Sequence, residues 1–393
     1  MTTEPEIQLV PTLERMRKKA KDISWSKLSQ IQKCPANWLA SNFLVFANVE
    51  SAAIENSLAV PGTVIQKMFE IFINSRIYNR PEMTSLEKIY EWFNTNTKLF
   101  FELCTFDYSE QYTLPSSEPR YYPRTNHGKA RVRAKYKEGL DPEFKSFKPQ
   151  FMDWIYFNSL HGDKTKFLER LNSLYPNILK IFLKYNLTLD KMLSEQYVQA
   201  WMFKGVKING GVDFLYNVNN HTKNYQMKTI NTLSSEYILI DGKHKISKYV
   251  EKEQLFFYAT VIGIAFKKWP SQLAFLDWSK GNFEFFDFPL TYVEELRAKV
   301  VNIVQLVDTT IAGIGQLIDQ GQTIIKVSEI PSAKFTPSQN GCRFCPMIGV
   351  CPAAIKSGIK DVSKDISIAK DGRRQAEAQF GDKPKGAVNQ VEL

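Results

Sequence analysis

The chain has 393 residues, of which 51 are Lys or Arg and 41 are Asp or Glu, so its formal net charge is +10. A hydrophobic content of 44% supports a sizeable buried core. The longest apolar run, 255–266, is too short to span a bilayer, and the N-terminus lacks the basic and apolar segments of a secretory signal. These features argue against membrane-spanning and secreted classes. We expect a cytoplasmic protein without a membrane partner, whose positive charge suits a polyanion.

Changes of composition along the chain predict seven segments. They are a polar N-terminal segment (1–22), a helical part with the first cysteine (23–115), a basic Tyr- and Arg-rich insertion (116–150), a helical lobe (151–196), a strand-rich core (197–330), a cysteine cluster (331–360) and a polar tail (361–393). The first segment ends in a basic stretch and is expected to be a loose tail or a first helix. We expect the last segment to be disordered or to bind a partner.

Two helix starts are visible in the helical part. Ser24 or Ser26 is suited to cap the first helix, and Pro35 either ends that helix or begins the next one. A later helix is predicted to start near residue 61. It places Gln66 and Glu70 one turn apart on the same face. A solvated helix face is the plainer interpretation of Glu70.

The insertion contains a stretch, 119–137, that has no acidic residue and interleaves tyrosines with Arg and Lys. Aromatic rings stack on bases while guanidinium and ammonium groups meet phosphates, so this pattern suits single-stranded nucleic acid. A mobile basic loop is the alternative. The candidate nucleic-acid-binding residues are Arg120, Tyr121, Tyr122, Arg124, Lys129, Arg131, Arg133 and Lys135.

The segment that follows the helical lobe has the texture of strands. We predict strands over 199–208, 212–218, 224–230, 237–243, 272–278 and 283–288, with helices over 247–266 and 291–319. A meander of strands with a crossover helix predicts an α/β fold in which helices flank a mixed sheet. The long apolar stripe of the last helix favours core packing.

Three short motifs in this core carry the chemistry. A Gly-x-x-Asp turn ends at Asp213, an apolar strand ends in Asp241-Gly242-Lys243, and a helix carries Gln254-x-x-x-Tyr258. Carboxylates are hard oxygen ligands of the kind that Mg²⁺ and Mn²⁺ prefer. Lys243 alternates back to the face of Asp241 on an extended strand, which puts its ammonium beside a metal-bound water or a phosphate.

Three of the five cysteines lie within ten residues, in the pattern Cys342-x2-Cys345-x5-Cys351. Clustered thiolates bind Zn²⁺ or an iron–sulfur cluster, and both usually take four ligands. Cys34 by itself reads as a small buried hydrophobe, and Cys104 as an ordinary thiol. Ligand chemistry alone leaves zinc and iron–sulfur open.

The order of these motifs resembles the PD-(D/E)XK nuclease superfamily, and the Gln-x-x-x-Tyr helix resembles its RecB-like branch. The Ser-x-Ser-x-Leu and Cys34-Pro35 opening is similar to that of members with an iron–sulfur cluster, such as AddB-type and CRISPR-adaptation nucleases; a phage-encoded enzyme would fit. The resemblance implies a restriction-endonuclease-like core over 197–330. It also implies that Cys34 joins Cys342, Cys345 and Cys351 as the distant ligand of a [4Fe-4S] cluster, with Zn²⁺ as the alternative.

The resemblance assigns roles at the site as well. It implies that Asp213, Asp241 and the Gly242 carbonyl hold Mg²⁺ or Mn²⁺, that Lys243 orients water or stabilises charge, and that Gln254 and Tyr258 position the strand or Lys243. Related proteins commonly have a His ligand where this chain has Gln66, a poorer ligand, and Glu70 follows one turn later within reach of the metal.

The resemblance therefore implies a DNA nuclease, an exonuclease or end-processing enzyme that prefers single-stranded DNA or free ends. The sequence has no Gly-x-x-x-x-Gly-Lys-Ser/Thr loop, so unwinding would require a helicase or recombination partner. Gln66 motivates the alternative of a catalytically weakened DNA-binding or assembly subunit. A zinc-stapled RNA-binding protein is a third hypothesis. For a phage-encoded enzyme the compartment is the host cytoplasm.

Overall fold

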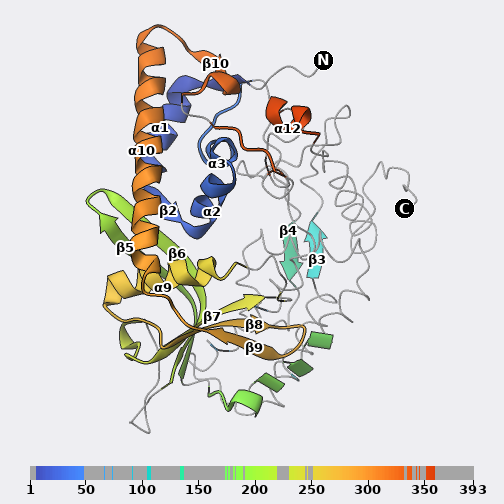
Figure 1. The fold of residues 1–393 in the computed structure, drawn as a ribbon. Coiled ribbons are helices and arrows are strands. Elements are labelled where there is room, and N and C mark those ends of the chain that lie inside the picture. The colour runs from blue at the N-terminus through green and yellow to red at the C-terminus, as the bar shows by residue number, and fades with distance from the viewer. Residues whose placement is uncertain are drawn as a thin grey trace.

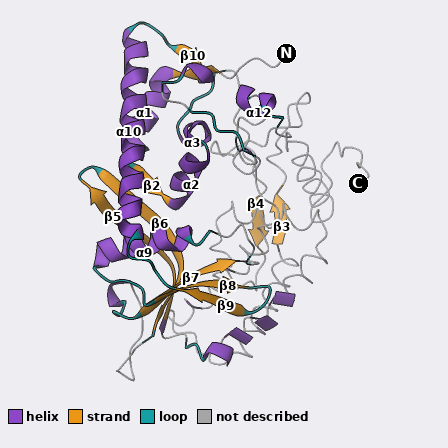
Figure 2. Cartoon of the chain, viewed as in Figure 1, coloured by secondary structure: helices purple, strands orange, loops and turns teal. Residues whose placement is uncertain are grey.

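The computed structural model of the chain is shown in Figures 1 and 2. It describes residues 6–47, 66, 73, 91, 104–107, 133–136, 173–174, 176–177, 180–181, 183–188, 191–218, 230–243, 246, 251–331, 334–338, 342, 345 and 351–358. Within these residues a twisted mixed sheet lies under two groups of helices (Figure 2). The predicted α/β class with a mixed sheet flanked by helices is confirmed.

Six strands form the main sheet: β2 (Asp22–Ser24), β5 (Met192–Phe203), β6 (Val206–Asn217), β7 (Tyr237–Lys243), β8 (Gln272–Asp277) and β9 (Asn282–Phe286). Their order is β2-β6-β7-β8-β9, with β5 along the other edge of β6. The β2–β6 and β7–β8 pairs are parallel, and the remaining pairs are antiparallel. The sheet is mixed, and parallel pairs require crossover connections.

Strand β6 has two different neighbours on one edge. Its last residues, 214–217, pair with β7, whereas 207–209 pair with β2. Between these two stretches β6 and β7 separate, since β7 continues beside β8 through Lys243. This separation, which we call the fork, leaves room for side chains between two strands that are otherwise joined by backbone hydrogen bonds.

Helix α9 (Glu253–Phe266) covers the fork and packs on β5, β6 and β7. Its buried side chains, among them Leu255, Phe257 and Ile262, join the main hydrophobic core. Burial of each such side chain is worth about 1.5–3 kcal/mol. A helix this apolar is held by the sheet on one side and by other helices on the other.

The N-terminal helices are α1 (Leu9–Lys19), α2 (Trp25–Lys33) and α3 (Pro35–Asn42). The Ser24 hydroxyl accepts a hydrogen bond from the Lys27 amide 3.5 Å away and caps α2, as predicted. Pro35 begins α3 at its first turn, which resolves the two alternatives in favour of a new helix.

Helix α10 (Tyr292–Asp319) runs alongside the N-terminal helices, in contact with α1, and reaches the level of α9 (Figure 1). Among the described helices it is long and apolar enough to cross a membrane by length and composition. The core helix of a globular protein passes the same test. Leu296, Val300 and Val307 are fully buried in the core, while Asn302 and Gln305 are exposed, so the stripe predicted from the sequence packs inward.

Segments from the two ends of the chain lie side by side. Strand β1 (Glu6–Gln8) pairs antiparallel with β10 (Ile324–Lys326), which precedes the short 3-10 helix Val327–Glu329. The Thr336 hydroxyl donates to the Lys33 carbonyl at 2.8 Å, and the Ala36 amide donates to the Lys334 carbonyl at 3.2 Å. Helix α12 (Pro352–Lys356) follows the last cysteine.

Several predicted element boundaries are wrong. The expected strand 199–208 is interrupted by a turn at Lys204-Gly205, where Gly205 has φ of +80°, a conformation that suits glycine. Strand β5 begins at Met192, before the predicted boundary at 197, and α9 begins at Glu253 rather than 247. Strands β3 (Cys104–Asp107) and β4 (Arg133–Tyr136) pair with each other in segments expected to be helical or loop. Thr and Phe in β3 favour extended backbone.

Candidate active site

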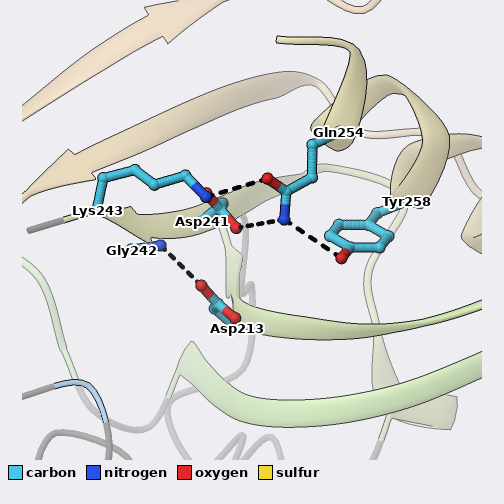
Figure 3. Close-up of polar contacts among 6 residues, drawn as sticks. All are labelled: Asp213, Asp241, Gly242, Lys243, Gln254 and Tyr258. Atoms are coloured by element: carbon cyan, nitrogen blue, oxygen red, sulfur yellow. Dashed lines mark hydrogen bonds and ion pairs between the residues drawn. The ribbon is translucent and has the colours of Figure 1, made fainter. Parts of the chain in front are cut away.

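The candidate site lies in the fork between β6 and β7. Asp213 comes from β6 one residue before its pairing with β7 begins, and Asp241 comes from β7 beyond the last pair. The Gly242 amide donates a hydrogen bond to Asp213 Oδ2 at 2.9 Å (Figure 3). A side chain thus takes the place that a backbone carbonyl would hold in a continued ladder.

Lys243, Asp241, Gln254 and Tyr258 form one connected polar network (Figure 3). Lys243 Nζ lies 2.6 Å from Asp241 Oδ2 and donates to Gln254 Oε1 at 3.0 Å. Gln254 Nε2 donates to Asp241 Oδ1 at 3.2 Å and to Tyr258 Oη at 3.3 Å. Gln254 therefore fixes both the lysine and the carboxylate from the helix side. Burial raises the pKa of Tyr258 to about 12, so its hydroxyl remains protonated.

Two glycines allow this close approach of strand and helix. A Cβ at Gly210 would lie 2.5 Å from the ring of Tyr258, so only glycine lets that ring rest on β6. A Cβ at Gly242 would lie 2.9 Å from the Trp278 indole nitrogen. These glycines belong to the Gly-x-x-Asp and Asp-Gly-Lys motifs. Their role is steric, since both have ordinary negative φ.

The two carboxyl groups disfavour each other's charge. The pKa of Asp213 is raised well above its usual range, first by burial and then by the neighbouring Asp241, while hydrogen bonds from Gly242 and Gln66 and the charge of Lys243 oppose the rise. Burial also raises the pKa of Asp241, against Lys243 and a hydrogen bond shared with Asp213. Burial and mutual repulsion therefore make two free carboxylate charges unfavourable at this position, and a bound cation would offset them.

The donor set fits a hard divalent ion. Asp241 Oδ2 is buried, and the Lys243 ammonium lies 2.6 Å from it as an ion pair. The Gln66 side chain lies next to Asp213 and donates a hydrogen bond to it. The amide oxygen of Gln66 is therefore near enough to serve as an uncharged metal ligand. Glu70 lies outside the described residues. Within the part of the chain that the structure describes, no three His, Cys, Asp or Glu side chains are grouped closely enough to hold a metal.

The four predicted cluster cysteines line one pocket. Cys34 is separated by about three hundred residues from Cys342, Cys345 and Cys351, yet all four are buried and line one pocket. The pocket has a volume of about 300 Å³, which includes the solvent at its mouth. Cys34 Sγ is held 3.8 Å from the Lys334 carbonyl. Burial raises the pKa of Cys342, and the neighbouring Cys34 and Cys351 add to the rise. The four thiols share this pocket, but within the described residues they are not drawn together closely enough to form a metal-binding group.

The predicted nucleic-acid-binding residues are placed only in part. Arg120, Tyr121, Tyr122, Arg124, Lys129 and Arg131 lie outside the described residues. Arg133 and Lys135 belong to β4, and Cys104 to β3, of which the backbone alone is described. Of the predicted strand 224–230 only Ile230 is described, and it begins the 3-10 helix Ile230–Thr232; the tail from 361 onward is outside the described part.

Sequence reasoning missed Asp277, which is fully buried at the end of β8 beside Lys243. Its carboxylate accepts four hydrogen bonds, from Ser279 N (2.9 Å), Ser279 Oγ (2.6 Å), Lys280 N (3.1 Å) and Ile246 N (3.1 Å). The Trp278 amide donates to the Lys243 carbonyl at 3.0 Å. The available signal was an apolar strand that ends in Asp, as β7 does, before a Ser-Lys-Gly turn.

A family model for the PD-(D/E)XK nuclease superfamily matches residues 22–352, which span both the fork and the cysteine pocket. The chain belongs to this superfamily. Its members are generally phosphodiester-hydrolysing nucleases that act on DNA and usually use Mg²⁺ or Mn²⁺. The mixed sheet is consistent with the restriction-endonuclease-like fold of this superfamily. A search of curated proteins found no match.

Proposed function

We propose that this superfamily member is a divalent-metal-dependent DNA nuclease that processes single-stranded DNA or free ends. The observation that carries the proposal is the fork, where two carboxylates of raised pKa meet an ammonium held 2.6 Å from Asp241. Asp213 and Asp241 would hold the ion. When bound, it polarises the scissile phosphate and lowers the pKa of an attacking water.

The chain's own groups then have distinct tasks. Lys243 places a positive charge where negative charge develops on the phosphorus oxygens, and a charge held in advance costs no reorganisation during the reaction. Gln254 accepts from Lys243 and donates to Asp241, so it fixes the distance between ammonium and carboxylate. Tyr258 anchors Gln254 one helical turn away.

The test is cleavage of end-labelled DNA by the purified chain with Mg²⁺ or Mn²⁺. We expect linear single strands to be degraded, and a circular single strand to resist an enzyme that requires ends. Asp241→Asn should lower the rate by at least about a hundredfold while the protein still folds, because the substitution removes a charged ligand. Glu294→Gln, on the exposed side of α10, is the matched control. Cleavage by Asp241→Asn at the wild-type rate would refute the assignment.

A catalytically weakened DNA-binding subunit is the second candidate. The observation that favours it is Gln66, which lies against Asp213 where related proteins commonly carry a His. On this alternative the wild type binds DNA without cutting it, and Gln66→His restores cleavage. Cleavage by the wild type at rates typical of nucleases excludes the alternative.

We further propose that Cys34, Cys342, Cys345 and Cys351 hold a [4Fe-4S] cluster. Support comes from four buried thiols around one pocket and from the arrangement of their segments, which are hydrogen-bonded across the chain ends. Anaerobic purification followed by iron, sulfide and zinc analysis tests this. About four iron atoms and four sulfides per chain would support the [4Fe-4S] cluster. One zinc per chain without iron would refute the cluster and support the zinc alternative.

A further inference from the structure

One face of strand β5 presents aromatic side chains to solvent. Tyr197 is 66% exposed and Trp201 is 63% exposed, and Gln199 between them is exposed as well. The alternate residues, Val198 and Ala200, are buried in the core. Side chains of this size usually bury most of their surface, so two exposed on one strand face mark a surface suited to binding.

This face lies beside the stretch of β6 that carries one residue of the candidate active site. Tyr197 is the register partner of Gly211, and Gly211 lies two residues before Asp213 on β6. Tyr197 and Gly211 lie on the face opposite Gly210 and the ring of Tyr258, beside the stretch of β6 that carries Asp213. A Cβ at Gly211 would meet nothing within 4 Å, so the sheet surface beside Tyr197 is uncovered at this position. Trp201 lies about 13 Å further along β5.

Positive charge accompanies the rings. Lys207 Nζ lies 5.3 Å from the centre of the Trp201 ring, and Lys204 is exposed in the turn that ends β5. Neither lysine forms an ion pair with an acidic side chain in the described ranges. The nearby Asp22 accepts a hydrogen bond from Asn209. Asp22 adds one negative charge beside Tyr197, and Lys204 and Lys207 add two positive charges to the same surface.

We propose that this β5 platform, defined as Tyr197, Trp201, Lys204 and Lys207, binds a single-stranded nucleic acid next to the fork. Bases stack on the two rings, and the lysines meet the phosphates. Exposed rings flanked by cations match unpaired bases with their charged backbone, whereas a duplex keeps its bases stacked internally. The platform rests on the proposed function, because it supplies substrate to the same site.

The experiment measures binding in the Asp241→Asn background, so that cleavage does not interfere. Fluorescence anisotropy with a labelled single-stranded oligothymidine and with a hairpin duplex is recorded for Tyr197→Ala, Trp201→Ala and Trp201→Phe. Each alanine should weaken single-strand binding by about five- to one-hundred-fold, the range expected for loss of one stacked base. Trp201→Phe, which keeps a ring, should stay within about threefold of the parent. Leu290→Ala, at another exposed site, should bind like the parent.

Several outcomes overturn the platform. They are unchanged single-strand affinity in both alanine variants, an equal loss for duplex and single strand, and no single-strand binding by the parent. A wild-type dimer that Trp201→Ala converts to monomer with unchanged DNA affinity would instead assign this face to a second copy. Failure of the proposed function is a separate result, because it would be seen as DNA cleavage by the Asp241→Asn variant at the same rate as the wild type.

Discussion

Asp213 and Asp241 are carboxyl groups placed where both cannot be charged without a cation. Burial raises the pKa of each above its ordinary value of 3.8, and Asp241 adds repulsion at Asp213. The folded protein therefore binds more protons than the unfolded chain between the ordinary and the raised pKa. Its stability must fall as pH rises through that window, since stability falls wherever the folded state holds the extra protons.

The first prediction follows from this sign. In EDTA, the melting temperature of the wild type should decrease from about pH 4 upward more steeply than that of Asp213→Asn, which lacks one of the titrating groups. Mg²⁺ or Mn²⁺ should raise the wild-type melting temperature more at higher pH, because the ion binds the deprotonated pair. Thermal melts across pH, with and without metal, measure both effects. Identical pH slopes for the two proteins in EDTA would contradict the prediction.

The second prediction concerns Gly210. Gly210→Ala puts a methyl group 2.5 Å from a ring atom of Tyr258, so the ring, and Gln254 with it, must move. We expect a loss of about 1–3 kcal/mol in stability and about a tenfold or greater loss of cleavage rate. Gly315→Ala, which meets nothing within 4 Å on α10, should be neutral or slightly stabilising. Chemical denaturation and cleavage rates together test this pair, and equal behaviour of the two variants would argue against it.

The sequence predicted the residues of the fork well, because short spacings place side chains within single elements. Asp241 and Lys243 share a strand face, and Gln254 and Tyr258 share a helix face, so periodicity suffices. Asp277 carries no comparable pattern. Asp277 accepts a hydrogen bond from the amide of Ile246, which follows the end of β7. This contact exists only after β7 and β8 have paired.

At the scale of elements, β7 and β8 end together and hold each other's C-terminal ends. Asp277 Oδ2 accepts from the Ile246 amide, while the Trp278 amide donates to the Lys243 carbonyl. The Lys243 carbonyl and the Ile246 amide are thus both held from the end of β8. We expect Asp277 to act as a positioning residue, since it accepts a hydrogen bond from the Ile246 amide three residues after Lys243.

The third prediction uses Asp277→Asn. The amide oxygen can still accept the three turn hydrogen bonds from Ser279 and Lys280, but its NH₂ group would face the Ile246 amide, donor against donor. We expect a stability cost of about 1–3 kcal/mol and a fall of about tenfold or more in kcat with little change in KM. Ser279→Ala, which removes one turn donor only, should keep kcat. Steady-state kinetics separate the two, and a similar kcat for both variants would reduce Asp277 to a structural role.

Element boundaries were the less predictable part of the fold. The β5–β6 hairpin was missed because Val206, Ile208 and the apolar residues of β5 read as one continuous run, and only Gly205 marks the turn. The sharing of β6 between β2 and β7 could not be predicted from periodicity. It depends on Ile23 reaching Ile208 across a separation of 185 residues in sequence.

At the scale of the whole molecule, the chain is closed on itself near its ends. Strand β1 pairs with β10, and the residues around Cys34 are hydrogen-bonded to Lys334 and Thr336. The sequence linked Cys34 to the other cysteines only through a family resemblance, because no local pattern connects positions so far apart. Closing so long a loop restricts the unfolded chain strongly, and the cost grows slowly with length.

The fourth prediction tests this closure. If a cluster joins Cys34 to the C-terminal cysteines, Cys34→Ser and Cys342→Ser should each lower the free energy of unfolding by about 4–6 kcal/mol, the value for a cross-link closing a loop of about three hundred residues. Each change leaves three ligands for a cluster that takes four; if the cluster is then lost, the same loop opens, and the double variant should be scarcely less stable than each single variant. Cys104→Ser, at the remaining cysteine, should change neither iron content nor stability by a comparable amount. Denaturation of anaerobically prepared protein measures the four variants. Additive losses in the double variant would show that the two cysteines act independently, and that the ends are held by packing and backbone hydrogen bonds alone.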